Sequence, residues 1–328
     1  MIVVTGAAGF IGSNIVADLA ARGEGPIAVV DWFGTDERWR NLARHPIAHY
    51  VRPEDILAFL DTHAGAVKAV VHMGAISATT ERDVDRLVEL NINYSVRLWD
   101  WCARAQVPFV YASSAATYGG REGGFVDEDS LDALSALEPL NAYGWSKNAT
   151  DIIFAQRIAN GEPAPPFWAG LKFFNVYGPN EYHKGDMMSV ACKLYAQVMA
   201  GETVRLFKSY REGIADGDQR RDFVYVKDCT RSILWLLDEQ KRSGIFNIGT
   251  GEARSFLDIA KALGRVVNRP VDVEFIDMPE SIRDRYQYYT EADMTKLRAA
   301  GYDRPYASLE EGVADYVLAH LARENRYR

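Results

Sequence analysis

The sequence has few cysteines and no long hydrophobic run. Its three cysteines, Cys102, Cys192 and Cys229, lie far apart and are odd in number, which fits neither a disulfide framework nor a CxxC metal site. No apolar run approaches the ~18 residues of a membrane-spanning helix. No basic segment precedes an apolar stretch near residue 1, so no secretory signal is predicted. We therefore expect a reduced, cytoplasmic protein that has no metal site and does not bind a membrane.

An excess of basic residues is also missing. The 328 residues carry a formal net charge of −8, whereas a nucleic-acid-binding protein needs a basic surface. The acidic balance still allows a local basic pocket for a phosphorylated small molecule. Hydrophobic residues make up 48% of the chain, which is enough for a large core and argues against disorder.

What the chain does have is an alternation of short apolar runs with helix-length segments over its first 175 residues. The runs are rich in β-branched and aromatic residues and predict strands at 2–5, 27–31, 69–72, 109–113 and 170–174. Helix-length segments lie between these strands. This alternation predicts an α/β fold with a Rossmann-type doubly wound parallel sheet.

The pattern changes after Pro179. A polar, charge-rich segment at 209–221 predicts an exposed loop, and amphipathic stretches follow it. We predict a first domain at 1–176, to which segments near 222–250 return. The remaining residues, 177–221 and 251–328, are predicted to form a smaller mixed α/β lobe.

Three glycines follow the first predicted strand and open a helix. Gly6, Gly9 and Gly12 are spaced G-x-x-G-x-x-G. Such glycines permit a tight turn, a close approach of backbone amides to a pyrophosphate and close helix–strand packing. The helix N-terminus then stabilises the anion. This context predicts a dinucleotide-binding turn, with the 1–176 domain as the dinucleotide-binding domain.

The second strand ends in an acidic residue, Asp31. A carboxylate at this position favours NAD, because it binds the 2′-hydroxyl of the adenosine ribose. Arg38 and Arg40 follow closely, and either could reach the 2′-phosphate of NADP. These residues alone leave the choice between NAD and NADP open.

A Tyr-x-x-x-Lys pair, Tyr143 and Lys147, lies at the start of a predicted helix. Spacing of four puts both side chains on one helix face. A nearby ammonium, together with the positive nicotinamide, would lower the pKa of the phenol. The resulting phenolate can take a hydroxyl proton while the nicotinamide accepts hydride. Ser114 ends an upstream strand and could bond the same substrate oxygen.

The glycine turn, the strand-end serine and the Tyr-x-x-x-Lys pair, in this order, resemble the extended short-chain dehydrogenase/reductases. These enzymes act mostly on nucleotide sugars. Asn91 and the stretches 174–179 and 221–226 also match this family, so the resemblance spans the chain. Members that dehydrate or decarboxylate sugars carry acidic residues after the serine, where this chain has Ala115 and Ala116. The resemblance therefore implies an epimerase.

Within that family, the chain resembles the ADP-L-glycero-D-manno-heptose 6-epimerases of lipopolysaccharide core synthesis. Segments 111–120, 183–185, 285–287 and 297–303 carry this likeness. It implies transient oxidation at C6″ of ADP-heptose by tightly bound NADP, with NAD possible. It also implies a second acid/base group, Lys184, opposite Tyr143, and a homo-oligomer, with a pentamer suggested.

The resemblance also implies which residues bind cofactor and substrate. The cofactor residues are Gly6, Gly9, Phe10, Ile11, Gly12, Asp31, Trp32, Arg38, Met73, Gly74, Ala75, Ser77, Asn91, Lys147 and Val176. The substrate residues are Ser114, Asn175, Lys193, Phe207, Lys208, Ser209, Arg221 and Tyr286. The 209–221 segment is longer than the family pattern, which keeps another nucleotide-sugar epimerase, for example at C4, as an alternative. A dinucleotide sensor without catalysis is a further alternative, against which the intact Ser–Tyr–Lys set argues.

Overall fold

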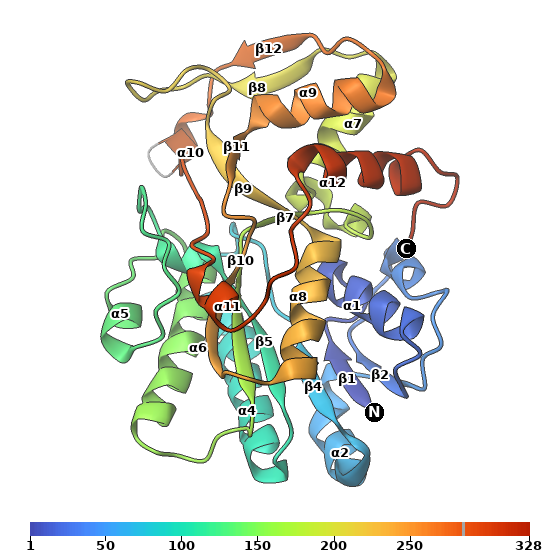
Figure 1. The fold of residues 1–328 in the computed structure, drawn as a ribbon, viewed down its shortest axis with the longest axis vertical. Coiled ribbons are helices and arrows are strands. Elements are labelled where there is room, and N and C mark those ends of the chain that lie inside the picture. Colours follow the sequence, from blue (N-terminus) through green and yellow to red (C-terminus); the bar gives the residue numbers. More distant parts are fainter. Residues whose placement is uncertain (284–285) are drawn as a thin grey trace.

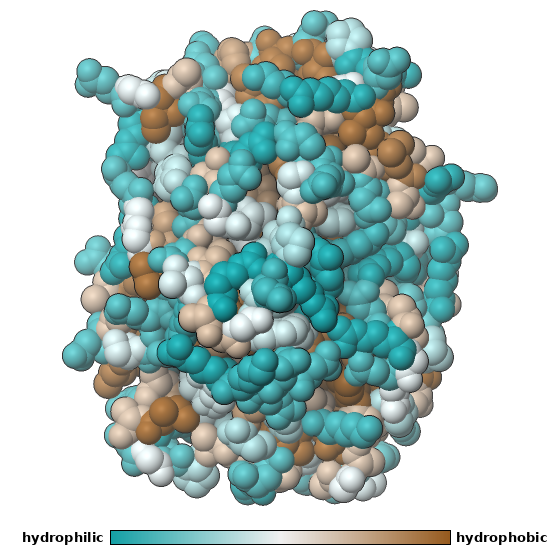
Figure 2. All heavy atoms as spheres, viewed as in Figure 1, coloured by the Kyte–Doolittle hydropathy of each residue, from teal (hydrophilic) through white to brown (hydrophobic). Residues whose placement is uncertain are grey.

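The computed structural model describes residues 1–283 and 286–328, and of Ser281 and Ile282 only the backbone. Arg285, in one of the segments that carry the resemblance, lies outside the described residues. Figure 1 shows two parts, a large sheet with helices on both faces and a smaller lobe above it. The space-filling view of the same side shows mainly hydrophilic residues, with hydrophobic residues in small groups (Figure 2).

The large sheet has seven parallel strands in the order β10-β6-β5-β4-β1-β2-β3. Its strands are β1 (Ile2–Thr5), β2 (Ile27–Val30), β3 (His49–Val51), β4 (Ala69–His72), β5 (Phe109–Ser114), β6 (Trp168–Phe173) and β10 (Gly244–Ile248). The predicted α/β fold with a doubly wound parallel sheet is confirmed. The edge strand β3 escaped prediction, since it has three residues and its Tyr50 is exposed, which leaves no apolar run.

Helices cover both faces of this sheet (Figure 1). They are α1 (Phe10–Ala21), α2 (Ile56–Thr62), α3 (Val84–Leu87), α4 (Tyr94–Ala105), α5 (Leu131–Ser135), α6 (Ala142–Ala159) and α8 (Val226–Glu239). Strand residues alternate between the faces. Val4 packs with Ile15 of α1 and Ile233 of α8, whereas the neighbouring Val3 packs with Trp99 of α4 and Phe154 of α6. The two apolar cores fix the ends of the strands where the site lies.

The smaller lobe contains two small sheets, ordered β11-β9-β7 and β12-β8. Its strands are β7 (Asn175–Tyr177), β8 (Val204–Phe207), β9 (Arg220–Tyr225), β11 (Ala253–Ser255) and β12 (Val273–Ile276). The further helices are α7 (Val190–Ala200), α9 (Phe256–Val267), α10 (Glu280–Arg283), α11 (Thr295–Ala299) and α12 (Leu309–Tyr316). Helix α9 packs against both α7 and α12. An apolar core between α7, α9, α12 and these strands holds the lobe together, and Phe10 of α1 packs into it.

The chain passes between the two parts more often than the predicted boundaries allow. Within 222–250, α8 and β10 return to the large sheet, but β9 does not. It pairs with β7 and β11, because β10 already occupies the open edge of β6. Leu297 and Tyr302 belong to the segment 251–328 that was predicted as lobe, yet both pack into the core of the large sheet.

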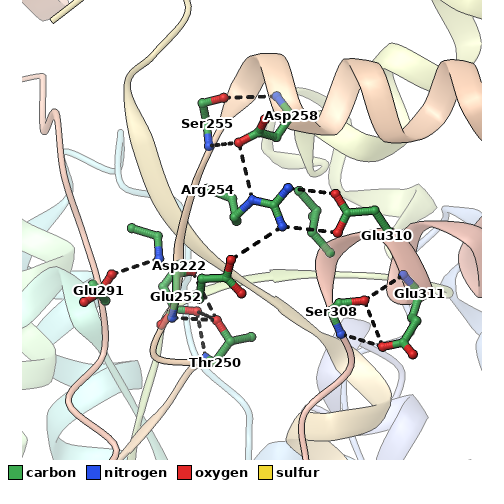
Figure 3. Close-up of polar contacts among 12 residues, drawn as sticks. Asp222, Thr250, Glu252, Arg254, Ser255, Asp258, Glu291, Ser308, Glu310 and Glu311 are labelled. Carbon is green, nitrogen blue, oxygen red and sulfur yellow. Dashed lines mark hydrogen bonds and ion pairs between the residues drawn. The ribbon is translucent and has the colours of Figure 1, made fainter.

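An ion-pair network around Arg254 ties three elements of the lobe together (Figure 3). The Arg254 guanidinium donates to both carboxylate oxygens of Glu310, at 2.7 and 3.1 Å, and lies 3.4 Å from Asp258. Asp258 also completes a capping box with Ser255 at the start of α9. Because Arg254 lies in β11 and Glu310 in α12, the network fixes α12 against the small sheet.

A buried carboxylate in β9 organises the loop that follows β10. Asp222 is fully buried and accepts hydrogen bonds from the backbone amides of Thr250, Gly251 and Ala292, at 2.7, 2.9 and 3.0 Å. Figure 3 shows Asp222 beside Thr250. These bonds satisfy a charge that burial would otherwise penalise. They join the lobe to the segment that returns to the large sheet.

Candidate active site

A cavity of about 590 Å³ opens at the carboxyl ends of β1, β4 and β5 and extends toward the lobe. In open α/β sheets this edge is where ligands bind. Thr5 and Gly6 line the cavity from β1, Met73 follows β4, and Ser114 ends β5. Lys184 lines the side that belongs to the segment after β7.

The glycine turn forms one end of this cavity. Gly6 has a φ of +61°, and a Cβ there would lie 2.6 Å from the Gly74 Cα. A Cβ on Gly12 would lie 2.1 Å from the Gly6 carbonyl oxygen. Only glycine fits at both positions, so the backbone of the turn faces the cavity directly. This cradle has the form that a dinucleotide pyrophosphate requires.

Asp31 closes the turn from the end of β2. Its Oδ2 accepts a hydrogen bond from the Ala8 amide at 2.8 Å. Arg38 also lines the cavity, but its guanidinium is held by Asp36 through contacts of 2.7 to 3.0 Å. Arg38 lowers the pKa of Asp36 to about 2. Of the residues weighed for the 2′ position of the ribose, Asp31 and Arg38 therefore both line the cavity, whereas Arg40 does not.

Fourteen of the fifteen predicted cofactor residues line the cavity, and the fifteenth, Asn91, is fully buried behind it. The Asn91 amide exchanges two hydrogen bonds with the backbone of Ile76, at 2.8 and 3.0 Å, and donates to Ser146 Oγ at 3.0 Å. Ile76 is part of the cavity lining. Asn91 therefore holds the loop after β4 in place. It supports the cavity indirectly, because it does not itself line the cavity.

The three residues Ser114, Tyr143 and Lys147 all line the same cavity. Helix α6 begins just before Tyr143, with Asn141 as its cap, accepting from the Gly144 amide at 2.8 Å. The Lys147 ammonium donates to the Ala112 carbonyl oxygen at 2.7 Å, which ties α6 to β5. The Ser114 hydroxyl lies near the Tyr143 phenol and favours its ionised form.

The lowered pKa of Tyr143 was expected from a nearby ammonium together with the positive nicotinamide, and the protein alone does not lower it. Burial raises the pKa of Tyr143, because it disfavours the phenolate, and the Ser114 hydroxyl opposes this only in part. Burial also lowers the pKa of Lys147 to about 8, although Asp151 opposes that shift. Near neutral pH, Lys147 therefore remains mostly protonated.

Behind this set lies a buried ion pair that the sequence analysis missed. Lys172 of β6 and Asp151 of α6 have fully buried side chains, with 2.9 Å between Nζ and Oδ2. Asp151 also accepts from Ser113 Oγ at 2.7 Å and from the Tyr111 hydroxyl at 2.9 Å. The sequence contained an indication of this ion pair, because Asp151 lies one helical turn after Lys147 and Lys172 interrupts an apolar strand. The network fixes the end of β5, which carries Ser114.

Lys184 lies in the short helical segment Tyr182–Met187, beyond the end of β7. Its ammonium lies 5.0 Å from the centre of the Phe10 ring, at the start of α1. Burial lowers the pKa of Lys184, while the nearby Glu181 carboxylate opposes the shift. Lys184 and Tyr143 are thus two titratable groups that lie on different elements around one cavity.

Three of the predicted substrate residues form a cluster in the lobe. The Arg221 guanidinium lies 5.2 Å from the centre of the Tyr286 ring, and the rings of Phe207 and Tyr286 meet edge to face at 6.1 Å. Arg221 is largely buried, and desolvation lowers its pKa. A guanidinium stacked on aromatic rings suits a nucleotide, because it offers both a charge and a flat surface.

The remaining predicted substrate residues are more dispersed. Lys208 forms an exposed 3.1 Å ion pair with Asp277, and Lys193 donates to the Asp186 carbonyl oxygen. Asn175 is exposed at the start of β7, and Ser209 accepts a hydrogen bond from the Arg211 amide. Of all eight predicted substrate residues, Ser114 alone lines the main cavity. The structure therefore gathers part of this set and leaves part of it at the surface.

The long 209–221 segment contributes to a second cavity of about 370 Å³ in the described part of the chain. Tyr210 and Arg211 line it together with Tyr286, Arg121 and Arg283. The Arg283 guanidinium lies 3.9 Å from the centre of the Tyr210 ring. The segment is therefore a structured wall of a basic, aromatic cavity beside the Arg221 cluster.

Among the residues that the structure describes, no group of three or more His, Cys, Asp or Glu side chains is placed to hold a metal ion. None of the helices in the described part of the chain is long and apolar enough to cross a membrane.

Comparison with known proteins relates this geometry to a family. The model of the NAD dependent epimerase/dehydratase family matches residues 2–249. An ADP-L-glycero-D-manno-heptose-6-epimerase of Fusobacterium nucleatum is 46% identical, over 100% of both chains. The crystal structure of the Helicobacter pylori enzyme of that name is 26% identical, with a TM-score of 0.79 over 96% of this chain and 94% of the other.

A solved relative also carries a dinucleotide. The Thermus thermophilus UDP-glucose 4-epimerase, in complex with NAD, is 26% identical, with a TM-score of 0.74 over 96% of this chain and 97% of the other. The glycine cradle and the cavity described above fit a nicotinamide dinucleotide. The match to the family model covers most of the chain, and this chain belongs to the NAD dependent epimerase/dehydratase family.

Proposed function

We propose that this protein is an epimerase that interconverts ADP-D-glycero-β-D-manno-heptose and ADP-L-glycero-β-D-manno-heptose. The observation that carries the proposal is the pair of proton-transfer groups, Tyr143 and Lys184, on separate elements of one cavity beside a dinucleotide cradle. The name of the full-length relative from Fusobacterium nucleatum supplies the substrate class. The product would serve lipopolysaccharide core synthesis.

The chemistry at C6″ is oxidation to a ketone followed by reduction from the opposite face. A bound nicotinamide supplies the hydride acceptor and, after it has accepted the hydride, the donor. The two epimers present their C6″ oxygen on different sides, so one proton-transfer group cannot serve both. We assign Tyr143 to one side and Lys184 to the other, each as base for one epimer and acid for the other.

The supporting residues have separate tasks. Ser114 would donate a hydrogen bond to the reacting oxygen beside Tyr143. Lys147 would hold its positive charge near the phenol and bind the nicotinamide ribose, while its bond to the Ala112 carbonyl oxygen keeps α6 in place. Burial of Lys184 favours its neutral form, which a base must have.

We assign the nucleotide part of the substrate to the lobe. Arg221 would pair with the diphosphate, and the rings of Phe207 and Tyr286 offer flat surfaces for adenine. The overall charge of −8 does not oppose this, because the cluster is locally basic. Asn175, Lys193, Lys208 and Ser209 remain proposed contacts from the resemblance.

We further propose NADP as the tightly held cofactor, with NAD as the alternative. Arg38 lines the cavity close to Asp31, and a guanidinium suits a 2′-phosphate. Asp36 competes for Arg38 in this arrangement, so the preference depends on whether a phosphate displaces that contact. The resemblance also suggests a cytoplasmic homo-oligomer, a pentamer, which light scattering of the purified protein tests.

The decisive experiment is incubation of the purified protein with ADP-D-glycero-β-D-manno-heptose without added cofactor. Proton NMR at C6″ follows the configuration. We expect conversion to a mixture of epimers, which requires both the substrate and a retained, recycled dinucleotide. No conversion, even with added NADP and NAD, would contradict the proposal.

Another nucleotide-sugar epimerase is the second candidate, because the long 209–221 segment builds a cavity wall beside Arg221. The same NMR assay with UDP-glucose distinguishes it. Epimerisation at C4 of UDP-glucose, without conversion of ADP-heptose, would favour this candidate.

A further inference from the structure

We propose that residues 326–328 form a clasp that positions Lys184. The inference rests on the proposed function, because it gives Lys184 the role of the second proton-transfer group. The clasp is far from Lys184 in sequence, and its residues do not line the main cavity. These are therefore positioning residues, which act on the reaction through the segment Tyr182–Met187.

The first contact of the clasp is with Tyr182, two residues before Lys184. The Tyr182 hydroxyl donates to the Arg326 carbonyl oxygen at 2.9 Å. The Arg326 guanidinium lies 4.2 Å from the centre of the Tyr182 ring, and the Tyr327 ring meets the same ring edge to face at 5.4 Å. The clasp therefore holds Tyr182 by a hydrogen bond, a cation–π contact and aromatic packing.

The second contact is with Asn180, whose backbone has a φ of +73°. Asparagine tolerates this left-handed conformation better than most residues, and an external bond helps to fix it. The Arg328 amide donates to Asn180 Oδ1 at 2.9 Å, and the Asn180 amide group donates to Ser13 Oγ of α1 at 3.1 Å. The turn that leads into the Lys184 segment is thus bonded to both the clasp and α1.

The third contact anchors the clasp itself to the dinucleotide side. The Arg328 guanidinium donates to Asn14 Oδ1 at 3.1 Å and forms an ion pair with Asp18, both on α1. Helix α1 begins at Phe10, whose ring lies under the Lys184 ammonium. Arg328 therefore links the backbone that carries Lys184 to the helix against which that ammonium rests.

The segment needs such support because its other end is loosely packed. Gly185 has a φ of +53°, and a Cβ built on it would meet nothing within 4 Å. Asp186 and Met187 are exposed. A buried carboxylate, Glu181, accepts from Tyr316 and Ser189, and its carbonyl accepts from the Lys184 amide at 3.0 Å. Glu181 holds the inner side of the segment, and the clasp holds the outer side.

The test compares Tyr327→Ala, the milder Tyr182→Phe and the control Glu324→Ala in the full-length holoenzyme. Glu324 is exposed in the same tail and has no hydrogen bond or ion pair among the described residues. Single-turnover experiments measure reduction of the bound dinucleotide by each heptose epimer separately. Lys184→Met defines which epimer depends on Lys184.

We expect Tyr327→Ala to slow the Lys184-dependent epimer about tenfold, since small misplacements of a proton-transfer group cost this much or more. The epimer served by Tyr143 should change less than about twofold, and Glu324→Ala should change neither. Tyr182→Phe should give a smaller loss of the same sign, because it removes only the hydroxyl bond. Equal slowing with both epimers would overturn the proposal.

Hydrogen exchange tests the clasp independently of the substrate. In Tyr327→Ala, the Lys184 amide should lose protection, while the amides of α9 should keep theirs. Unchanged protection of the Lys184 amide would overturn the clasp, even if the wild-type protein epimerised ADP-heptose. Absence of turnover by the wild-type protein would contradict the proposed function instead.

Discussion

The two parts of the molecule hold their functional groups in different ways. At the dinucleotide side, backbone geometry holds the site, because Gly6 and Gly12 leave no room for a side chain. A Cβ on Gly12 would meet Gly6 of the same turn, and a Cβ on Gly6 would meet Gly74 in the loop after β4. In the lobe, contacts between side chains from segments that are distant in the sequence hold the structure. Arg254 and Glu310, for example, lie in β11 and α12. A local motif defines the first arrangement, whereas only the complete fold defines the second.

The two sides should therefore differ in the substitutions that they tolerate. A methyl group added to a glycine of this turn would clash with backbone atoms, and these atoms cannot shift without a cost in free energy. A charged network at the surface of a lobe loses one of several contacts when a member is removed, and solvent screens the remainder. We therefore expect mutations on the two sides to differ in the size of their effects and in the property that they change.

The largest effect should come from Tyr143→Phe, which removes the proposed proton-transfer group but leaves the glycine turn unchanged. We expect epimerisation to fall by about 10³-fold, within the range for general acid–base groups, while the dinucleotide still co-purifies. Turnover by NMR and cofactor content of the purified protein are measured together. Tyr94→Phe is the matched control, because Tyr94 lines the same cavity. Undiminished turnover in Tyr143→Phe would contradict the proposed mechanism.

Gly12→Ala should disrupt the glycine turn itself. The new Cβ would lie 2.1 Å from the Gly6 carbonyl oxygen, so the turn must shift, and we expect dinucleotide affinity to fall by at least about tenfold. Fluorescence titration of the stripped protein measures this. Gly65→Ala is the control, because a Cβ there meets nothing within 4 Å. Equal affinities in both variants would show that backbone approach at Gly12 does not matter.

Arg38→Ala should have a smaller, selective effect. If Arg38 binds a 2′-phosphate, its removal should weaken NADP binding by about tenfold, or about 1.4 kcal/mol, and leave NAD binding nearly unchanged. The ratio of the two dissociation constants is the measurement. Arg40→Ala provides the comparison, because Arg40 lies nearby, is exposed and does not line the cavity. A parallel loss for both dinucleotides would contradict the assignment of NADP.

Arg254→Ala should give the smallest effect, on stability alone. Arg254 is 22% exposed and Glu310 is 40% exposed, so we expect a loss of about 1 kcal/mol in the free energy of unfolding. A double-mutant cycle with Glu310→Ala isolates the pair, and the exposed Arg205→Ala should change stability by less than about 0.5 kcal/mol. A coupling energy near zero would mean that packing, not charge, fixes α12.

The sequence predicted the features whose cause is local. Strands β1 and β4 lie at the predicted residues, since short apolar runs define them. The predicted cofactor residues gather around one cavity, except Asn91, because they follow successive parallel strands whose carboxyl ends meet. The order of the glycine turn, the strand-end serine and the Tyr-x-x-x-Lys pair was enough to predict that these residues surround one cavity.

Features with a long-range cause escaped prediction. Strands β8 and β12 are short and pair across a wide sequence separation, so neither shows a clear pattern alone. The buried pair of Asp151 and Lys172 and the carboxylate of Glu181 become visible only when the fold places them. The predicted return of segments near 222–250 does not distinguish β9 from α8 and β10, because nothing local to β9 reveals that it pairs with β7 and β11.

The repeated passage of the chain between the two parts has a consequence for how such proteins diversify. After β6 the polypeptide enters the lobe, returns for α8 and β10, leaves for α9 and returns again at α11, before α12 ends in the lobe (Figure 1). No contiguous piece of sequence therefore corresponds to the lobe. A recombination event with a single junction therefore cannot exchange the whole lobe between relatives, whereas point changes and changes of loop length can alter it piece by piece.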